Sequence, residues 1–511
     1  MLFLGAFRGG LWSALAWVAL VPLLWAVRRV TLPTALGLAA LWGVLSGYAI
    51  AEPFPPSISE YFEQPVWVGW AFAVGLFAVM ASPYYMLFVA LDRGLAAGRG
   101  RAWHPIVVAC AWIAVEWLRG RLFTETIFFI GNPWGQLGAS QLAALPLVQI
   151  AAWTGLYGPS FLVALVNAVI ADALEAREHG GAYAPEHGGW QARDAGARFA
   201  LVAVPIVASL AYGWSVVPPF DPEPPGAVRV AAVQPNLELG VRWKREYYGR
   251  NLERHLRQSV EVARETRPPV IFWPEGSFTF FLEDEPAYRR TIARTLAVLD
   301  AELVAGGPAK EVEGEGATLR NRVFVLDPRG TIRGRYDKEH LVPFSEYVPG
   351  RAPDPMRRDF GQARAFVHGT RTAPLQTRAG RIGVLICNEA LLSEVAAERV
   401  RAGAQLLANP SNDSWVAEED FARRMLEHVA FRSIELRRWQ VRASTEGPSA
   451  VIDPFGRVTA ATPHGEAGTL LAAVVPRDDL TGYARFGDWF PALCVAIVGV
   501  AAVALRRRAR D

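Results

Sequence analysis

The sequence predicts a bundle of membrane-spanning α-helices joined to an α/β domain, and three observations lead to this fold class. Hydrophobic residues make up 52% of the 511 residues and the mean hydropathy is +0.17, which is too apolar for an ordinary soluble enzyme. Several apolar runs are long enough, or nearly so, to cross a bilayer. Near the end of the chain, shorter apolar runs alternate with charged helical stretches, a pattern typical of an α/β domain.

The membrane part is predicted from seven apolar runs, near residues 11–27, 33–52, 68–92, 104–118, 146–174, 197–215 and 488–505. The fifth run contains Gly155, Gly158 and Pro159, so we expect its helix to be broken. Arginines cluster after the first, third, fifth and seventh runs, and such clusters mark the cytoplasmic side of a membrane. The segment of about 216–487 is therefore expected on the outer side. The same rule places the N-terminus outside, so we expect a beginning that is short or misassigned.

The predicted organisation has four parts: a transmembrane domain of about six helices (1–217), a proline-rich linker (218–227), an extracytoplasmic α/β domain (228–487), and a last transmembrane helix with a basic cytoplasmic tail (488–511). In the α/β domain, apolar runs near 228–233, 270–273, 323–326, 382–386, 406–408 and 469–475 are predicted strands. Residues 246–266 and 421–439 show helical spacing. Two Asp-Pro-x-Gly segments, 327–330 and 453–456, are predicted hairpin turns.

Composition excludes some functions. The net charge of +3 is small for this length, so the chain lacks the excess of basic residues that is typical of nucleic-acid-binding proteins. The three cysteines are an odd number on distant segments, which argues against a disulfide framework. The eight histidines lack metal-ligand spacing, so we expect no metal site, and no motif indicates a cofactor.

Cys387 stands at the carboxyl end of a predicted buried strand, where α/β sheets place their ligands. A thiol there could be a nucleophile, although a cysteine taken alone is more often a buried core residue. Glu275 follows another predicted strand, between a proline and a glycine, and Lys338 and Glu346 flank a short apolar run. A base, a cation and a thiol in three such places favour nucleophilic catalysis over three unrelated side chains.

Several motifs together identify a family. They are YDKEHLVPFSEYVP at 336–349, WPE at 273–275, CNE at 387–389, SNDSW at 411–415, EWLRG at 116–120 and NPW at 132–134. With the multispan first half, they resemble the bacterial apolipoprotein N-acyltransferases of the carbon-nitrogen hydrolase (nitrilase) superfamily. The resemblance implies an αββα sandwich, no cofactor, and a place in the bacterial cytoplasmic (inner) membrane with the catalytic domain on the periplasmic side.

The resemblance also implies roles for residues. Glu275, Lys338 and Cys387 would be the catalytic triad and Glu346 a second essential acid, while Glu389 and Trp415 would line the site. Trp243 matches a family position and is expected at the membrane interface. The chain departs from the family at Asn388, where an aromatic residue is usual, and in lacking the first of the usual eight spans; the first departure bears on acyl-chain packing.

The implied reaction moves a fatty acyl chain from a membrane phospholipid to the N-terminal α-amine of a diacylglyceryl-modified apolipoprotein, through a thioester on Cys387. Phe278, Phe280 and Phe281 form an apolar cluster after Glu275, and we expect them either to dip into lipid and guide acyl chains or to pack in the core. Two alternatives stay open: a membrane-tethered amidase or nitrilase using the same triad, and a transporter or scaffold with a degenerate outer domain.

Overall fold

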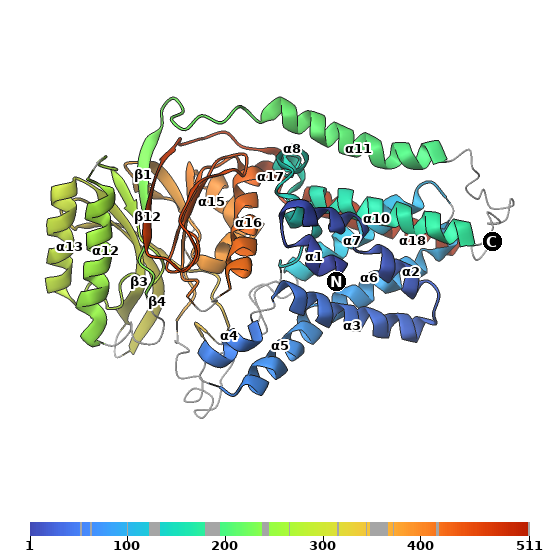
Figure 1. Cartoon of the computed structure of the whole chain (residues 1–511), viewed down its shortest axis with the longest axis horizontal. Helices are drawn as coiled ribbons and strands as arrows, with labels where there is room; N and C mark the ends of the chain where they lie inside the picture. The colour runs from blue at the N-terminus through green and yellow to red at the C-terminus, as the bar shows by residue number, and fades with distance from the viewer. Residues whose placement is uncertain are drawn as a thin grey trace.

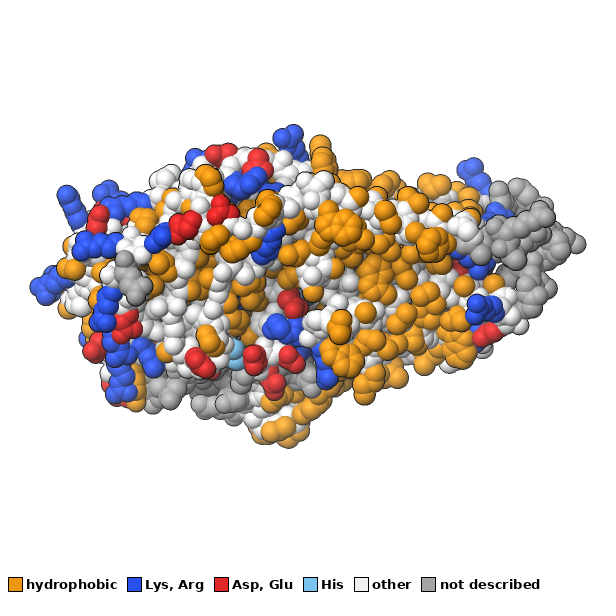
Figure 2. Space-filling view, turned by 45° about the horizontal axis from the view of Figure 1, so that its top comes forward, with side chains coloured by type: hydrophobic (Ala, Val, Ile, Leu, Met, Phe, Trp, Pro, Cys, Tyr) orange, Lys and Arg blue, Asp and Glu red, His pale blue; other side chains and the backbone are white. Residues whose placement is uncertain are grey.

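The computed structural model of this chain describes residues 1–51, 54–61, 64–99, 101–121, 133–178, 195–237, 245–264, 266–313, 316–343, 345–347, 366–370, 373–414 and 418–508. Helices form one half of the molecule and two sheets with their own helices form the other (Figure 1). The two halves differ in surface: hydrophobic side chains cover much of the helical half in this view, and charged side chains gather on the sheet half (Figure 2).

The helical half is built mainly from the first part of the chain and from the last helix. Its elements are α1 (Leu2–Ala6), η1 (Gly10–Val18), α2 (Val21–Val27), α3 (Leu32–Ile50), α4 (Phe54–Tyr61), α5 (Val66–Met80), α6 (Ser82–Gly94), η2 (Ala96–Gly98), α7 (His104–Arg121), η3 (Leu137–Gln141), α8 (Leu145–Val148), α9 (Ala151–Thr154), α10 (Tyr157–Glu178), α11 (Ala195–Val216) and α18 (Trp489–Arg508).

All seven predicted runs are helical, but they are not seven uninterrupted spans. Within the described residues, five stretches are long and apolar enough to cross a membrane: Gly10–Val27, Val66–Gly94, Tyr157–Glu178, Gly196–Val216 and Trp489–Arg507. The predicted break in the fifth run is confirmed, since α9 ends at Thr154 and is followed by Gly155, which has a φ of +65°. The third run is also interrupted, because α5 ends at Met80 and α6 begins at Ser82, one residue before a proline.

The other half contains two six-stranded sheets. The first has the order β12 (Gly468–Val474), β1 (Val228–Gln234), β2 (Val270–Phe272), β3 (Glu302–Glu313), β4 (Gly316–Leu326) and β5 (Ile332–Asp337). The second has the order β11 (Val458–Ala461), β10 (Ala450–Ile452), β9 (Gln440–Ser444), β8 (Leu406–Ser411), β7 (Gly380–Val384) and β6 (Leu375–Thr377). Both sheets are mixed: β1, β2 and β3 run parallel, as do β7, β8 and β9, and antiparallel strands flank them.

Helices cover the outer face of each sheet, which confirms the predicted αββα sandwich. The inner faces pack on each other through side chains such as Val230, Phe272, Val384 and Val441. Against the first sheet lie α12 (Tyr248–Val262) and α13 (Pro286–Leu299), after the short η6 (Arg245–Tyr247); against the second lie α15 (Ser393–Arg401) and α16 (Glu419–Leu436), with η7 (Cys387–Leu391) and α17 (Gly482–Phe486) beside them. The pair α12 and α13 lies at the end of the molecule farthest from the helical half (Figure 1).

The six strands predicted from sequence are present, and both predicted turns join antiparallel strands. Asp327–Gly330 connects β4 to β5 and Asp453–Gly456 connects β10 to β11, with positive φ at each glycine. Predicted helices 246–266 and 421–439 correspond to α12 and α16. The prediction missed six strands, β3, β5, β6, β9, β10 and β11, and the helices α13, α15 and α17.

Candidate active site

The three predicted triad residues follow the ends of strands in both sheets. Glu275 comes three residues after β2 and Lys338 directly after β5, both in the first sheet, whereas Cys387 comes three residues after β7 in the second. A glycine makes room for the base: a Cβ on Gly306 of β3 would lie 2.8 Å from the Glu275 Cα. Because the inner faces of the sheets pack together, these strand ends meet at one place.

Lys338 lies between two carboxylates. Its Nζ is 3.3 Å from Glu275 Oε1 and 2.9 Å from Glu346 Oε2, and its side chain is only 1% exposed. The second Glu275 oxygen, Oε2, accepts a hydrogen bond from the backbone N–H of Asn412 at 3.0 Å. Asn412 follows β8, so this contact joins the first sheet to the second. The structure thus brings Glu275, Lys338 and Glu346 together in one buried cluster, as the sequence predicted for a base and a cation.

Asn321 on β4 is a member of this cluster that the sequence analysis missed. Its Nδ2 donates to Glu275 Oε1 and to Glu346 Oε1, each at 2.6 Å, and its backbone carbonyl accepts the Lys338 N–H at 2.9 Å. Both amide hydrogens are therefore used on carboxylates, which fixes the position of each carboxylate relative to the lysine. A polar residue in a long strand gives no signal of its own in a single sequence.

Burial and charge set the protonation of the site. Burial by itself lowers the pKa of Lys338, but Glu275 and Glu346 outweigh it and raise that pKa above its usual value, so the ammonium stays charged. Burial raises the pKa of Glu275, Lys338 opposes the rise, and Glu346 adds to it. Two carboxylates that share one ammonium carry one net negative charge when both are ionised, so the cluster is suited to accept one proton.

Burial, with the nearby Glu275 carboxylate, raises the pKa of the Cys387 thiol to about 12, against the opposing effect of Lys338. The thiol is therefore protonated near neutral pH, and its use as a nucleophile requires a base that removes the proton during attack. Glu275 is the carboxylate with the largest effect on this thiol.

The backbone of Cys387 is held in an unusual conformation. Its φ is +51°, a value that residues other than glycine adopt rarely and that is often found at functional sites. Asn409 on β8 supports it, because its Nδ2 donates to the carbonyls of Leu385 at 2.6 Å and Cys387 at 3.1 Å. Arg442 donates to Asn409 Oδ1 and so fixes the orientation of that amide.

Glu389, predicted to line the site, is fully buried. Its Oε1 accepts the N–H groups of Glu339 at 2.8 Å and His340 at 3.0 Å, and its Oε2 accepts the N–H of Ile386 at 2.7 Å. The Tyr336 hydroxyl also lies within 3.0 Å of both oxygens. The carboxylate thus ties the segment after Lys338 to the segment before Cys387, which positions two triad residues relative to each other.

Comparisons with known proteins match both halves of the chain. Residues 229–484 match the family described as carbon-nitrogen hydrolase, and residues 1–169 match the apolipoprotein N-acyltransferase N-terminal domain. An apolipoprotein N-acyltransferase of Geobacter metallireducens is 32% identical over 97% of this chain and 92% of that protein. The chain belongs to the apolipoprotein N-acyltransferase family. It is therefore an acyltransferase of lipoprotein maturation built on a nitrilase fold.

Two further similarities complete the comparison. An apolipoprotein N-acyltransferase of Methylococcus capsulatus is 30% identical over 94% of this chain and 90% of that protein. The crystal structure of the C. elegans NitFhit protein superposes with a TM-score of 0.40 at 21% identity, covering 49% of this chain and 61% of that chain.

The structure decides between the two expectations for Phe278 and Phe280. Phe278 and Phe280, expected as one possibility to dip into lipid, are 0% and 2% exposed and pack in the core between the first sheet and α12 and α13. Phe278 contacts Trp273 and Phe324, and Phe280 contacts Tyr288, through ring centroids 4.8 to 6.0 Å apart. The loop folds back under the sheet because that is where its aromatic area is removed from water. Phe281 beside them is half-buried.

The remaining predicted substrate-binding residues are placed in part. Asn388 is half-buried next to the nucleophile, and its Nδ2 donates to the His340 carbonyl at 3.3 Å. Trp243 and Trp415 lie outside the described residues. Among the described residues, no three His, Cys, Asp or Glu side chains group closely enough to hold a metal ion.

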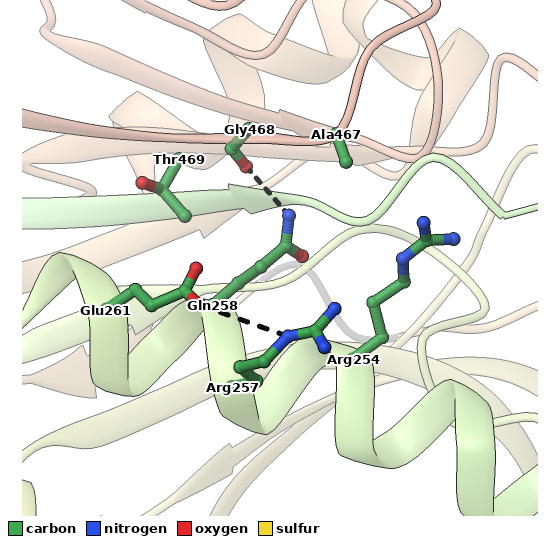
Figure 3. Close-up of a pocket in the computed structure, with 7 residues that line it drawn as sticks. All are labelled: Arg254, Arg257, Gln258, Glu261, Ala467, Gly468 and Thr469. Atoms are coloured by element: carbon green, nitrogen blue, oxygen red, sulfur yellow. Dashed lines mark hydrogen bonds and ion pairs between the residues drawn. The ribbon is translucent and has the colours of Figure 1, made fainter.

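A shallow cavity of about 290 Å³ lies away from the triad. Arg254, Arg257, Gln258 and Glu261 of α12 line it together with the backbone at the start of β12 (Figure 3). The Gln258 amide is held by the carbonyls of Gln234 and Gly468, and Glu261 lies 3.9 Å from Arg257. Its lining contains none of the predicted triad residues, and α12 lies far from the helical half (Figure 1).

Proposed function

We propose that this enzyme transfers a fatty acyl chain from a membrane phospholipid to the N-terminal α-amine of the S-diacylglyceryl-cysteine of apolipoproteins, through a thioester on Cys387. The observation that carries the proposal is the buried cluster in which Lys338 lies between Glu275 and Glu346, next to a protonated thiol. Such a cluster can take one proton from Cys387 and keep a positive charge beside the reacting carbonyl.

In the first half-reaction, the Cys387 sulfur attacks the ester carbonyl of the phospholipid while its proton passes to Glu275. Lys338 stabilises the oxyanion that forms, with help from backbone N–H groups near residue 388. Collapse of this intermediate releases a lysophospholipid, whose alkoxide takes a proton from Glu275. Glu346 and Asn321 hold the side chains of Lys338 and Glu275 in position during these steps.

In the second half-reaction, the free α-amine of the diacylglyceryl-modified cysteine attacks the thioester. Glu275 takes a proton from the amine and returns it to the departing Cys387 sulfur, and the N-acylated lipoprotein is released. An acyl-enzyme in a site bordered by lipid meets little water, which favours the amine over hydrolysis. The reaction as written needs no cofactor or metal ion.

We place the enzyme in the bacterial cytoplasmic membrane, with residues 228–487 as the catalytic domain on the periplasmic side, after the linker 218–227. The arginine-rich ends support this orientation: α10, with Arg177 in its last turn, and α18, which ends at Arg508, both finish at the end of the helical half away from the sheets (Figure 1). The ten-residue linker would then follow the transmembrane domain of 1–217 at the outer surface.

Mass spectrometry of the purified full-length enzyme tests the proposal. Incubation with phosphatidylethanolamine in detergent micelles should add one acyl mass to Cys387, and a synthetic diacylated lipopeptide should remove it and gain the same mass. The C387S variant is the control and should give no thioester. Discharge to water alone would favour a membrane-tethered amidase or nitrilase, and a wild-type protein that forms no adduct would refute acyl transfer and favour a scaffold.

A further inference from the structure

The short helix η7, which begins at the nucleophile, is held at both ends. At its first residue, the Cys387 carbonyl accepts a hydrogen bond from Asn409 Nδ2 at 3.1 Å. At its last residue, the Leu391 carbonyl accepts one from Arg432 Nη1 at 2.8 Å. Since η7 has five residues and rises about 2 Å per residue, the two attachments lie roughly 8 Å apart. The first attachment comes from a strand of the second sheet, and the second comes from the covering helix α16.

Arg432 forms a buried ion pair with Glu435, three residues later in α16. Arg432 Nε lies 2.8 Å from Glu435 Oε2, and the two side chains are 1% and 0% exposed. Residues three apart lie on the same side of a helix, so the two side chains can meet there. A buried ion pair is costly unless each partner has further hydrogen bonds. Arg432 has the Leu391 carbonyl, and Glu435 has donors of its own.

Glu435 connects this ion pair to the helical half. Its Oε1 accepts the backbone N–H of Leu156 at 2.8 Å, and the Ser393 hydroxyl donates to the same oxygen at 3.3 Å. Leu156 stands between Gly155 and the start of α10, where backbone N–H groups lack a partner within the helix and the helix dipole favours a negative charge. The packing is close here, because a Cβ on Gly155 would lie 2.8 Å from Tyr483 Cε2 of α17.

These contacts form one path from a membrane helix to the nucleophile. The start of α10 bonds to Glu435, and Glu435 pairs with Arg432. Arg432 in turn bonds to the end of the helix whose first residue is Cys387. The Glu275 carboxylate is held by separate contacts, among them the Asn321 amide. Loss of the path would therefore leave the base in place but would free the nucleophile's helix from the helical half.

We propose that Arg432 and Glu435 are positioning residues that set the place of Cys387 relative to the helical half, by tying the end of η7 to the start of α10. The inference rests on the proposed function, in which the acyl donor is a membrane phospholipid. A lipid beside the membrane helices presents its ester carbonyl at a depth that those helices determine, so the sulfur must be placed against the same helices. The two residues thus govern the meeting of lipid and sulfur, and the reactivity of the thiol itself does not depend on them.

The test uses the double variant R432M/E435Q of the full-length enzyme in detergent. It removes both charges together, so no unpaired charge is left buried. Glutamine can still accept the Leu156 N–H, whereas methionine cannot donate to the Leu391 carbonyl. R438M is the matched control: Arg438 is also 1% exposed and follows α16, and within the described residues its hydrogen bonds go to backbone carbonyls outside η7. R432K keeps a donor and should recover part of the lost rate.

Two rates at Cys387 are measured by mass spectrometry. Alkylation by iodoacetamide, a small water-soluble reagent, reports the reactivity of the thiol. Acylation from phosphatidylethanolamine in mixed micelles also requires that lipid and sulfur meet. We expect R432M/E435Q to be acylated on the order of 10-fold to 100-fold more slowly, because a small displacement of a reacting atom has an effect of this size. Its alkylation should stay within twofold of the wild type, and R438M should match the wild type in both rates.

The inference is supported if acylation alone falls in R432M/E435Q and R432K lies between this variant and the wild type. It is overturned if R432M/E435Q is acylated at the wild-type rate. It is also overturned if alkylation falls by the same factor as acylation, because that result assigns the effect to the thiol or to the fold as a whole. Failure of the proposed function gives a different result: the wild type itself forms no acyl adduct although iodoacetamide alkylates it, and the inference then fails with the proposed function.

Discussion

Replacing Asn321 with leucine tests whether the base is held in its ionised form by its neighbours. The Asn321 amide donates to Glu275 Oε1 and to Glu346 Oε1, each at 2.6 Å, and leucine has a similar shape but no donor. Glu346 keeps Lys338 and the Val342 N–H as partners, whereas Glu275 keeps Lys338 at a longer distance and one backbone N–H. The substitution therefore weakens the hydrogen bonding of Glu275 more than that of Glu346.

The size and sign of the effect follow from that contact. A hydrogen bond to a charged acceptor contributes about 1.5–3 kcal/mol, so thioester formation should slow roughly 10-fold to 100-fold. The Asn321 bond lowers the pKa of Glu275, so its removal raises that pKa and keeps the base protonated up to a higher pH. The acid limb of the rate profile should move to higher pH, and the loss should be largest at low pH.

The assay is rapid quenching of acyl-Cys387 formation from phosphatidylethanolamine between pH 5 and pH 9, followed by mass spectrometry. Thermal unfolding of N321L in the same detergent checks that the fold is intact. A rate within twofold of the wild type at every pH, or an acid limb displaced to lower pH, would contradict the role given to Asn321 and to Glu275 as the base.

Two other pairs of substitutions separate support of the site from packing. Glu389→Gln should slow thioester formation more than tenfold and lower the unfolding temperature, because an amide cannot accept all the donors that converge on the carboxylate. Tyr336→Phe removes only one of these donors and should have a smaller effect on both quantities. Equal effects of the two substitutions would argue against this ranking. Phe280→Ser should destabilise the fold by about 3–5 kcal/mol, as expected for truncation of a core aromatic side chain, and Phe281→Ser should destabilise it by less. A Phe280→Ser variant that unfolds at the wild-type temperature would restore a lipid-facing role for this loop.

The strands that carry Glu275 and Cys387 could be predicted because each is a short apolar run that ends in a polar residue. The neighbouring strands could not. β3 contains Gly306, Gly307 and Pro308, which weaken any strand pattern, and they are tolerated because the backbone of Glu275 and the side chain of Phe278 pack against the glycines. β5, with the sequence IRGRYD, is mostly polar because it is the edge strand of its sheet.

The residues of the site also divide into those that could be predicted from the sequence and those that could not. Residues with an ionisable or nucleophilic side chain at a strand end, such as Lys338, are visible in the sequence as candidates. Asn321 and Asn409 are not, because their contribution depends on which strand lies beside which. The resemblance implied that Glu389 lines the site; in the structure its carboxylate is buried and accepts the Ile386 N–H, beside the positive φ of Cys387.

In the proposed reaction, the arrangement of the two sheets would separate the path of the acyl chain from that of the proton. Cys387 belongs to the second sheet, whose covering helix α16 contacts the helical half: Arg424 donates to the Ile50 carbonyl at 3.0 Å, and Glu435 accepts the Leu156 N–H at 2.8 Å. Glu275 and Lys338 belong to the first sheet, whose helices lie at the far end (Figure 1). In the proposed reaction, an acyl donor that comes from the side of the helical half would reach the Cys387 sulfur from one side, and the thiol proton would leave toward Glu275 on the other side. Lipid that fills the site would then not block the base.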